Sequence, residues 1–170
     1  MKFFLIESDE ELVFTQFLNF YKHIEWKQLG TWDIPRLNSF SVSLTGDAEF
    51  LDIITKPILM LSKEFSEIVQ IYDATITFKY ATLYDAKVNR HMTYGMPHLE
   101  IVDCLLPESE LSLERRILKR VILRREAVYG RTLFQLAEVE GRYYVASLEL
   151  VESAFRREVN GLKITEVELV

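Results

Sequence analysis

The chain has 170 residues, a formal net charge of −6 and 49% hydrophobic residues, which together predict one globular domain over residues 1–170. This composition excludes a disordered chain, and the acidic balance argues against nucleic acid as a partner, because such binding needs a basic surface. The single cysteine excludes an internal disulfide, and no run approaches the ~18 apolar residues that span a bilayer. We therefore expect a soluble, cytoplasmic protein that makes no membrane contact.

The N-terminal segment predicts a short strand and then a helix. Residues 2–6 are mostly apolar and precede a group of acidic residues, which is typical of a short strand rather than a secretory signal. Residues 10–21 predict a helix, although an irregular segment packed through its aromatic rings fits the same residues. The side chains with approximate helical spacing are Phe14, Phe17, Leu18, Tyr21 and Ile24.

The next segments predict a loop, a strand and a hairpin. Residues 29–37 contain a glycine and a proline and predict a loop, whereas residues 40–44 alternate apolar and polar side chains as a half-buried strand does. A strand over residues 76–84 meets the polar turn 85–89, which predicts a hairpin back through residues 91–94.

The segment from residue 110 onward is ambiguous. Residues 110–118 predict a short helix. The apolar positions of 119–125 fit either a helical stripe or one strand face, and we favour a strand. This preference depends on residues 129–131, which resemble a hairpin turn into a strand over 133–136. Residues 140–142 then predict a turn into the last part of the chain.

One unit, a strand, a serine, an amphipathic helix and a second strand, occurs twice, at about 58–83 and 143–169. Ser62 and Ser147 stand where each helix would begin and are predicted N-caps. The fold class predicted is α+β, a mostly antiparallel sheet with two or three packed helices. The few matching residues leave open whether the two units arose by duplication. We expect these helix residues to be buried: Phe65, Ile68, Val151 and Phe155.

Cys104 and the histidines do not form a predicted catalytic or metal site. Cys104 lies in an apolar run, where a cysteine is usually a small buried side chain rather than a nucleophile. His23, His91 and His98 lack the close spacing of a preformed zinc site. The glycines form no phosphate-binding loop. We therefore predict no catalytic residues, no metal and no cofactor, and a protein that is not an enzyme.

A cluster of basic residues is the strongest local anomaly of charge. Two interpretations stay open for it: a contact surface for an anionic partner or an RNA backbone, or a solvated face paired with neighbouring glutamates. The net acidic charge favours the second interpretation. The basic run comprises Arg115, Arg116, Lys119, Arg120, Arg124 and Arg125.

A set of stretches along the chain forms a further pattern: 50–57, 71–73, 78–79, 94–97, 101–105, 133–136, 142–145, 150–153 and 161–162. Together these stretches resemble a group of uncharacterised Firmicutes proteins. That group is similar to a bacterial immunity-protein family of polymorphic toxin systems, formerly a domain of unknown function. The resemblance covers roughly residues 14 to 168.

The resemblance implies a cytoplasmic, non-catalytic protein that binds a cognate protein toxin and neutralises it by occlusion. It supplies no catalytic signature and no toxin-contact residues. An acidic inhibitor would also approach a cationic toxin faster through electrostatic steering. The alternative is an RNA- or anion-binding module that uses the basic run at 115–125.

Overall fold

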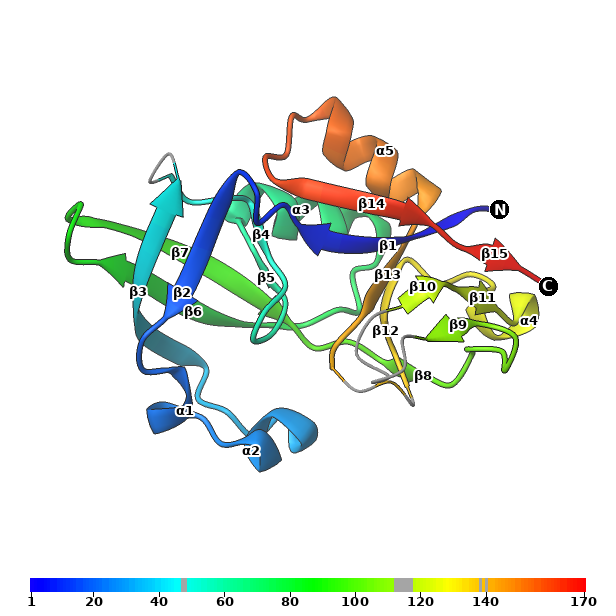
Figure 1. Ribbon diagram of the computed structural model, residues 1–170, viewed down its shortest axis with the longest axis horizontal. Coiled ribbons are helices and arrows are strands. Elements are labelled where there is room, and N and C mark those ends of the chain that lie inside the picture. The colour runs from blue at the N-terminus through cyan, green and yellow to red at the C-terminus, as the bar shows by residue number, and fades with distance from the viewer. Residues whose placement is uncertain (47–48, 112–117, 138, 140) are drawn as a thin grey trace.

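The computed structural model describes residues 1–46, 49–111, 118–137, 139 and 141–170, and these form a mixed α+β fold with mostly antiparallel sheets (Figure 1). The predicted fold class is therefore confirmed. The helices are α1 (Phe20–His23), α2 (Trp26–Thr31), α3 (Lys63–Tyr72), α4 (Arg125–Val128) and α5 (Leu148–Arg156). The strands are β1 (Phe3–Ser8), β2 (Val13–Phe17), β3 (Leu37–Gly46), β4 (Ile53–Ile54), β5 (Met60–Leu61), β6 (Phe78–Asp85), β7 (Arg90–Pro97), β8 (Ile101–Val102), β9 (Glu110–Leu111), β10 (Leu118–Arg120), β11 (Ile122–Leu123), β12 (Leu133–Leu136), β13 (Tyr144–Ser147), β14 (Leu162–Glu166) and β15 (Glu168–Leu169).

The larger sheet has six strands in the order β2-β3-β6-β7-β5-β4, so β2 is one of its edges. The hairpin predicted around residues 85–89 is confirmed, because β6 and β7 pair antiparallel from Phe78 opposite Pro97 to Asp85 opposite Arg90. The buried Asp85 carboxylate accepts hydrogen bonds from the backbone N–H groups of Leu44 and Lys87, both at 2.8 Å. These two bonds connect the hairpin turn to β3.

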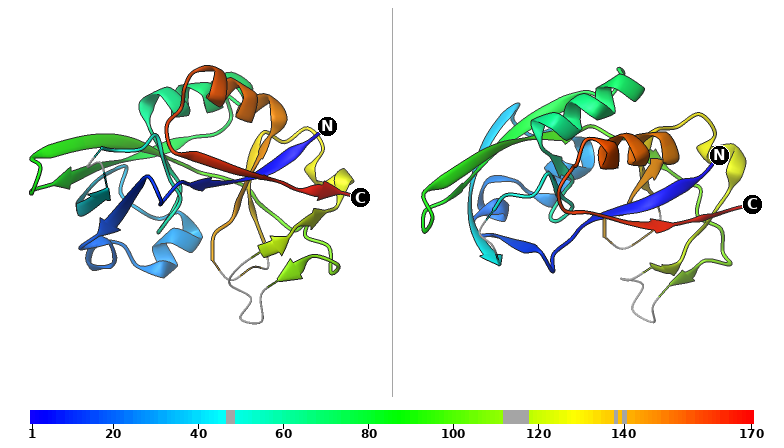
Figure 2. Two further views of the ribbon diagram at one scale, coloured as in Figure 1. Left: turned by 45° about the horizontal axis from the view of Figure 1, so that its top comes forward. Right: turned by 90° about the horizontal axis from the view of Figure 1, so that it is seen from above.

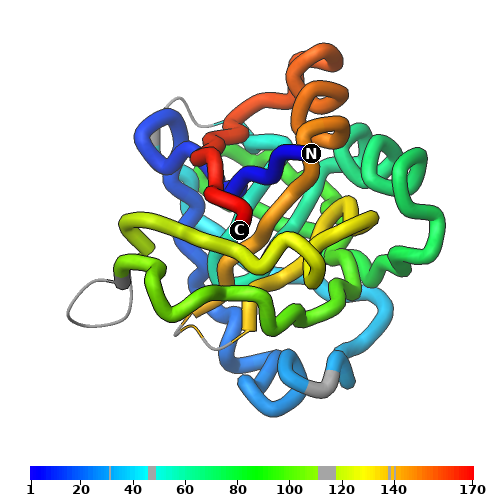
Figure 3. The backbone as a smooth tube through the Cα atoms, turned by 90° about the vertical axis from the view of Figure 1, so that its right-hand side faces the viewer, coloured from blue at the N-terminus to red at the C-terminus, as the bar shows by residue number. Residues whose placement is uncertain are grey.

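The smaller sheet has five strands in the order β14-β1-β13-β12-β8. Its central region is antiparallel, since β1 pairs with β13 on one side and with β14 on the other. The two ends of the chain lie close together, as Figure 3 shows, and Lys2 forms an ion pair with Glu166 at 2.9 Å.

The two predicted strand-helix-strand units have the same topology. In the first, β5 and β6 run parallel with the antiparallel strand β7 between them; in the second, β13 and β14 run parallel with β1 between them. Each is a split β-α-β unit. The helices α3 and α5 lie side by side on one side of the sheets (Figure 2). Both contribute to one apolar core, together with strand residues of both sheets.

The serine caps of these two helices are confirmed. The Ser62 hydroxyl accepts a hydrogen bond from the Phe65 N–H at 3.2 Å, and the Ser147 hydroxyl accepts one from the Leu150 N–H at 3.4 Å. Each bond satisfies one of the free N–H groups of the first helical turn. Gly161 follows α5 with φ +83°, a conformation that glycine adopts without strain.

The prediction that Phe155 is buried is wrong, whereas Phe65, Ile68 and Val151 are buried as predicted. In α5 the buried stripe consists of Leu150, Val151, Ser153 and Ala154. Phe155 lies one position beyond Ala154, which rotates its side chain by about 100° around the helix axis and away from the core. It is 47% exposed.

The predicted helix over residues 10–21 is also wrong. Residues 13–17 form β2 instead, which pairs antiparallel with β3 from Val13 opposite Gly46 to Phe17 opposite Val42, and only the short α1 follows. Aromatic side chains at this spacing fit both structures, so pairing with β3 decides between them. The predicted loop at 29–37 is wrong in part, because α2 continues to Thr31, but the strand predicted at 40–44 lies within β3.

The chain between residues 110 and 131 differs from prediction in three respects. Residues 110–111 are strand β9, paired with β10, rather than the start of a helix; residues 112–117 lie outside the described part of the chain. Residues 119–125 are only partly strand, since α4 begins at Arg125. The predicted hairpin at 129–131 is wrong, because β11 pairs in parallel with β15 while β12 pairs with β13 and β8. Strand pairing decides the first and the third of these outcomes.

None of the helices in the described part of the chain combines the length and the apolar character that crossing a bilayer requires.

Candidate functional site

The basic run does not form one continuous surface element. Lys119 and Arg120 lie in β10, Arg124 precedes α4, and Arg125 is the first residue of that helix. The other two predicted members, Arg115 and Arg116, lie outside the described residues. The change from strand to helix divides the run between two local structures.

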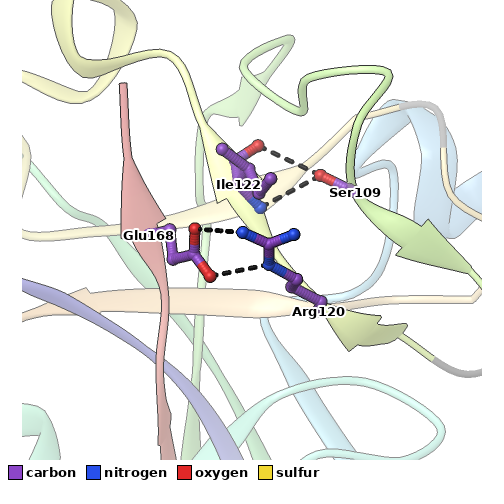
Figure 4. A network of polar contacts seen from close by, with 4 residues as sticks. All are labelled: Ser109, Arg120, Ile122 and Glu168. Carbon is purple, nitrogen blue, oxygen red and sulfur yellow. Dashed lines mark hydrogen bonds and ion pairs between the residues drawn. The ribbon is translucent and has the colours of Figure 1, made fainter.

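Arg120 forms a two-pronged ion pair with Glu168 of β15 (Figure 4). Its Nε and Nη2 atoms donate to the two carboxylate oxygens at 2.7 Å each. The hydrogen bond and the positive charge of Arg120 lower the pKa of Glu168, and the same contact raises the pKa of Arg120. This pairing leaves Arg120 with less capacity to bind an external phosphate.

The neighbouring residues attach the same region to the end of the chain. The Ser109 hydroxyl accepts a hydrogen bond from the Ile122 N–H at 3.0 Å and donates one to the Ile122 carbonyl at 3.1 Å (Figure 4). The backbone N–H of Arg125 donates to the Val170 carbonyl at 2.7 Å, and its side chain donates to the Leu169 carbonyl at 3.4 Å. The side chains of all four described basic residues are exposed. Those of Arg120 and Arg125 form hydrogen bonds within the described part of the chain, whereas none is found there for those of Lys119 and Arg124.

Cys104 is fully buried in an apolar cluster that includes Val102, Leu123 and Phe134. Burial raises the pKa of its thiol to about 11, and the charge of Asp103 contributes in the same direction. The reactive thiolate form is therefore scarce at neutral pH. Within the described residues, no group of three His, Cys, Asp or Glu side chains is arranged to hold a metal ion.

A second surface, which we call the aromatic groove, lies along the edge strand β2. It has a volume of about 640 Å³ and is lined by residues 14–22 together with Glu10, Lys56 and Pro57. Large side chains of this region remain well exposed to solvent. Their exposed fractions are 43% for Phe14, 55% for Leu18, 51% for Tyr21 and 62% for Trp26.

Ring contacts hold the exposed side chains of the groove in place. Tyr21 stacks on Trp26 with ring centroids 5.1 Å apart and an interplanar angle of 29°. Tyr21 also meets the buried Phe20 edge to face at 5.1 Å, and Phe20 lies 4.9 Å from Phe40 of β3. The Arg142 guanidinium lies 5.7 Å from the Trp26 ring, a cation–π contact. The groove is therefore attached to the core of the larger sheet.

The sequence prediction missed the aromatic groove because it assigned Phe14, Leu18 and Tyr21 to one face of a helix. In β2 the burial alternates instead, with Val13 inside and Phe14 outside. The apolar residues 13, 14, 17 and 18 keep helical spacing, so the local pattern gave no signal for the strand.

A scan of the whole chain against protein-family models finds no match, and a search of the curated proteins finds none either. The surfaces described above are therefore the observations from which a function can be proposed.

Proposed function

We propose that this protein is a non-catalytic immunity-type protein that binds and neutralises a cognate protein toxin through the aromatic groove. The observation that carries the proposal is the convergence of Phe14, Leu18 and Tyr21 on one solvent-accessible groove. Grouped exposed apolar side chains of this kind are typical of protein interaction sites, and aromatic residues are enriched there. The toxin as partner comes from the family resemblance.

The position of the groove at a sheet edge favours an extended segment of the toxin as the bound element. Residues 14–17 of β2 all line the groove, and among the described strands β2 has a paired neighbour, β3, on one side only. An edge strand can accept an added strand through its free backbone groups, while adjacent apolar side chains supply specificity. The bound segment would thus place apolar side chains against Phe14 and Leu18.

The rigidity of the aromatic groove favours neutralisation of the toxin by occlusion. The paired register of β2 with β3 and the contact of Phe17 with Phe20 at 5.7 Å hold the groove before any partner arrives. A preorganised surface loses little conformational entropy on binding, which favours a tight complex. The net charge of −6 would also accelerate association with a cationic toxin.

The alternative, an RNA- or anion-binding module, has less support from the geometry. Of its described residues, Arg120 is paired with Glu168 and Arg125 contacts the Leu169 carbonyl. Binding of Arg120 to phosphates would have to compete with its ion pair to Glu168. Lys119 and Arg124 are then the exposed basic side chains that form no ion pair or hydrogen bond among the described residues.

The test is a toxicity rescue combined with co-purification of the product encoded beside this gene. We expect wild-type protein to rescue cells and to co-purify with that product. The double variant Phe14→Ala/Leu18→Ala should weaken the complex by about tenfold or more, since interface side chains of this size commonly contribute that much. The matched control Ile71→Ala/Tyr129→Ala removes exposed apolar side chains elsewhere, 66% and 78% exposed, and should leave rescue unchanged.

Two outcomes contradict the proposal. Undiminished binding and rescue by Phe14→Ala/Leu18→Ala would show that the groove is not the contact surface. Absence of rescue and of a co-purified protein, together with RNA binding that Arg120→Glu/Arg124→Glu abolishes, would instead establish the alternative function.

A further inference from the structure

A small cavity lies where residues of both sheets meet α2. Its volume is about 50 Å³, and its wall includes Leu29 and Gly30 of α2. The polar side chains at the wall come from both sheets or the segments beside them: His98 follows β7, Gln135 lies in β12, Arg142 precedes β13, and Tyr144 is the first residue of β13. The cavity therefore lies between the two split β-α-β units.

Tyr144 presents a buried hydroxyl at this cavity. Its side chain is 3% exposed, and its oxygen accepts a hydrogen bond from the Leu59 N–H at 3.0 Å. The described residues supply no acceptor for the hydroxyl proton itself. Burial raises the pKa of Tyr144 to about 12, so the hydroxyl keeps that proton at neutral pH. A buried donor that lacks an acceptor favours a ligand oxygen at this point.

Arg142 presents a second donor at the same cavity. Its Nε atom is buried and has no hydrogen-bond partner among the described residues. The guanidinium contacts the ring of Trp26, and no described carboxylate lies within ion-pair distance of it. Leaving a guanidinium N–H buried and unpaired is costly, more so than for a neutral group, and an anionic acceptor removes that cost.

The size and shape of the cavity restrict the ligand. Since one water needs about 10–15 Å³ of such volume, the cavity has room for roughly three waters, or for a group of a few non-hydrogen atoms. One part of its wall carries the Trp32 and His98 rings, which stack 5.2 Å apart with an interplanar angle of 6°. Two N–H or O–H donors at so small a cavity suit an anion with two acceptor oxygens.

We propose that this cavity is a binding site for a small carboxylate, which accepts hydrogen bonds from Arg142 Nε and from the Tyr144 hydroxyl. The site contacts both halves of the molecule, so its occupation stabilises their mutual arrangement by mass action. The inference does not depend on the proposed toxin partner. It concerns a cavity distinct from the aromatic groove, although Trp26 lies near both.

The test uses tryptophan fluorescence, because both tryptophans of the chain lie at the site: Trp32 lines the cavity and Trp26 contacts Arg142. Full-length protein is titrated with sodium acetate, with chloride and inorganic phosphate in parallel at equal ionic strength. We expect a saturable change with acetate in the millimolar range, as is usual for so small a ligand. Acetate should also raise the urea midpoint of unfolding relative to chloride.

Variants assign the response to the site. Arg142→Gln should weaken acetate binding by about tenfold or more, and Arg142→Lys should weaken it less, because lysine keeps the charge but has no guanidinium fork. The matched control Arg90→Gln, at an exposed arginine of β7, should bind acetate as wild type does. The acetate-dependent shift of the urea midpoint provides a second readout if Arg142→Gln alters the baseline fluorescence.

Three results overturn the proposal. The first is a linear acetate response equal to that of chloride. The second is an equal acetate affinity in wild type and in Arg142→Gln. The third is phosphate binding as strong as acetate binding, which would contradict the assignment to carboxylates.

Discussion

Replacement of Gly161 by alanine tests a contact between two distant parts of the chain. Gly161 lies in the second split β-α-β unit, between α5 and β14, and Leu51 lies before β4. Gly161 has φ +83°, and a Cβ atom there would lie 2.8 Å from both Cδ atoms of Leu51. Leu51 is only 2% exposed, so it has little space into which to move. The left-handed backbone costs an alanine about 1–2 kcal/mol, and overpacking costs about 1–3 kcal/mol. We therefore expect Gly161→Ala to lower the free energy of unfolding by about 2–5 kcal/mol.

Gly130→Ala is the matched control, because Gly130 has φ +73° but a Cβ atom there meets nothing within 4 Å. It should lower the free energy of unfolding by about 1–2 kcal/mol, the backbone contribution alone. Urea denaturation followed by circular dichroism measures both variants. The difference between them, about 1–3 kcal/mol, isolates the clash with Leu51.

Equal losses in the two variants would refute this reasoning. A double-mutant cycle provides an independent measurement, since Leu51→Ala removes the side chain that the new methyl group meets. The cost of Gly161→Ala should then be smaller in the Leu51→Ala background than in wild type. An unchanged cost would mean that Leu51 is not the source of the destabilisation.

The remaining predictions concern helix caps, the thiol and pH. Ser62→Ala and Ser147→Ala should each lower the free energy of unfolding by about 0.5–2 kcal/mol, measured by urea denaturation; losses no larger than those of an exposed serine variant would contradict capping. Cys104 should react slowly with a thiol reagent in the folded protein and rapidly in urea, and fast labelling of the folded protein would contradict a buried thiol with a raised pKa. The pKa of Tyr144 is raised from 10.0 to about 12, because burial disfavours the phenolate. The protonated hydroxyl therefore contributes its full stabilisation below pH 10, and this contribution is lost between pH 10 and 12. The free energy of unfolding of the wild type should fall relative to that of Tyr144→Phe across that interval, and parallel curves would contradict this expectation.

The two long helices and the central hairpin follow from local sequence. Ser62 and Ser147 stand before amphipathic segments, and a serine hydroxyl satisfies a free N–H group at a helix start wherever that helix packs. The polar turn at 85–89 connects two strands whose pairing is local in sequence. Short-range interactions specify these elements, so the fold class could be predicted from the sequence.

The candidate functional surfaces depended on contacts between distant parts of the chain. Phe14 and Leu18 are exposed because pairing with β3 makes residues 13–17 a strand, and Arg120 is neutralised because β15 brings Glu168 beside it. Neither partner is near in sequence, and the local pattern of apolar residues fits both helix and strand. The sequence by itself therefore determined the capped helices, the hairpin and the α+β class, whereas tertiary pairing decided which aromatic side chains face solvent and which basic side chain is held in an ion pair.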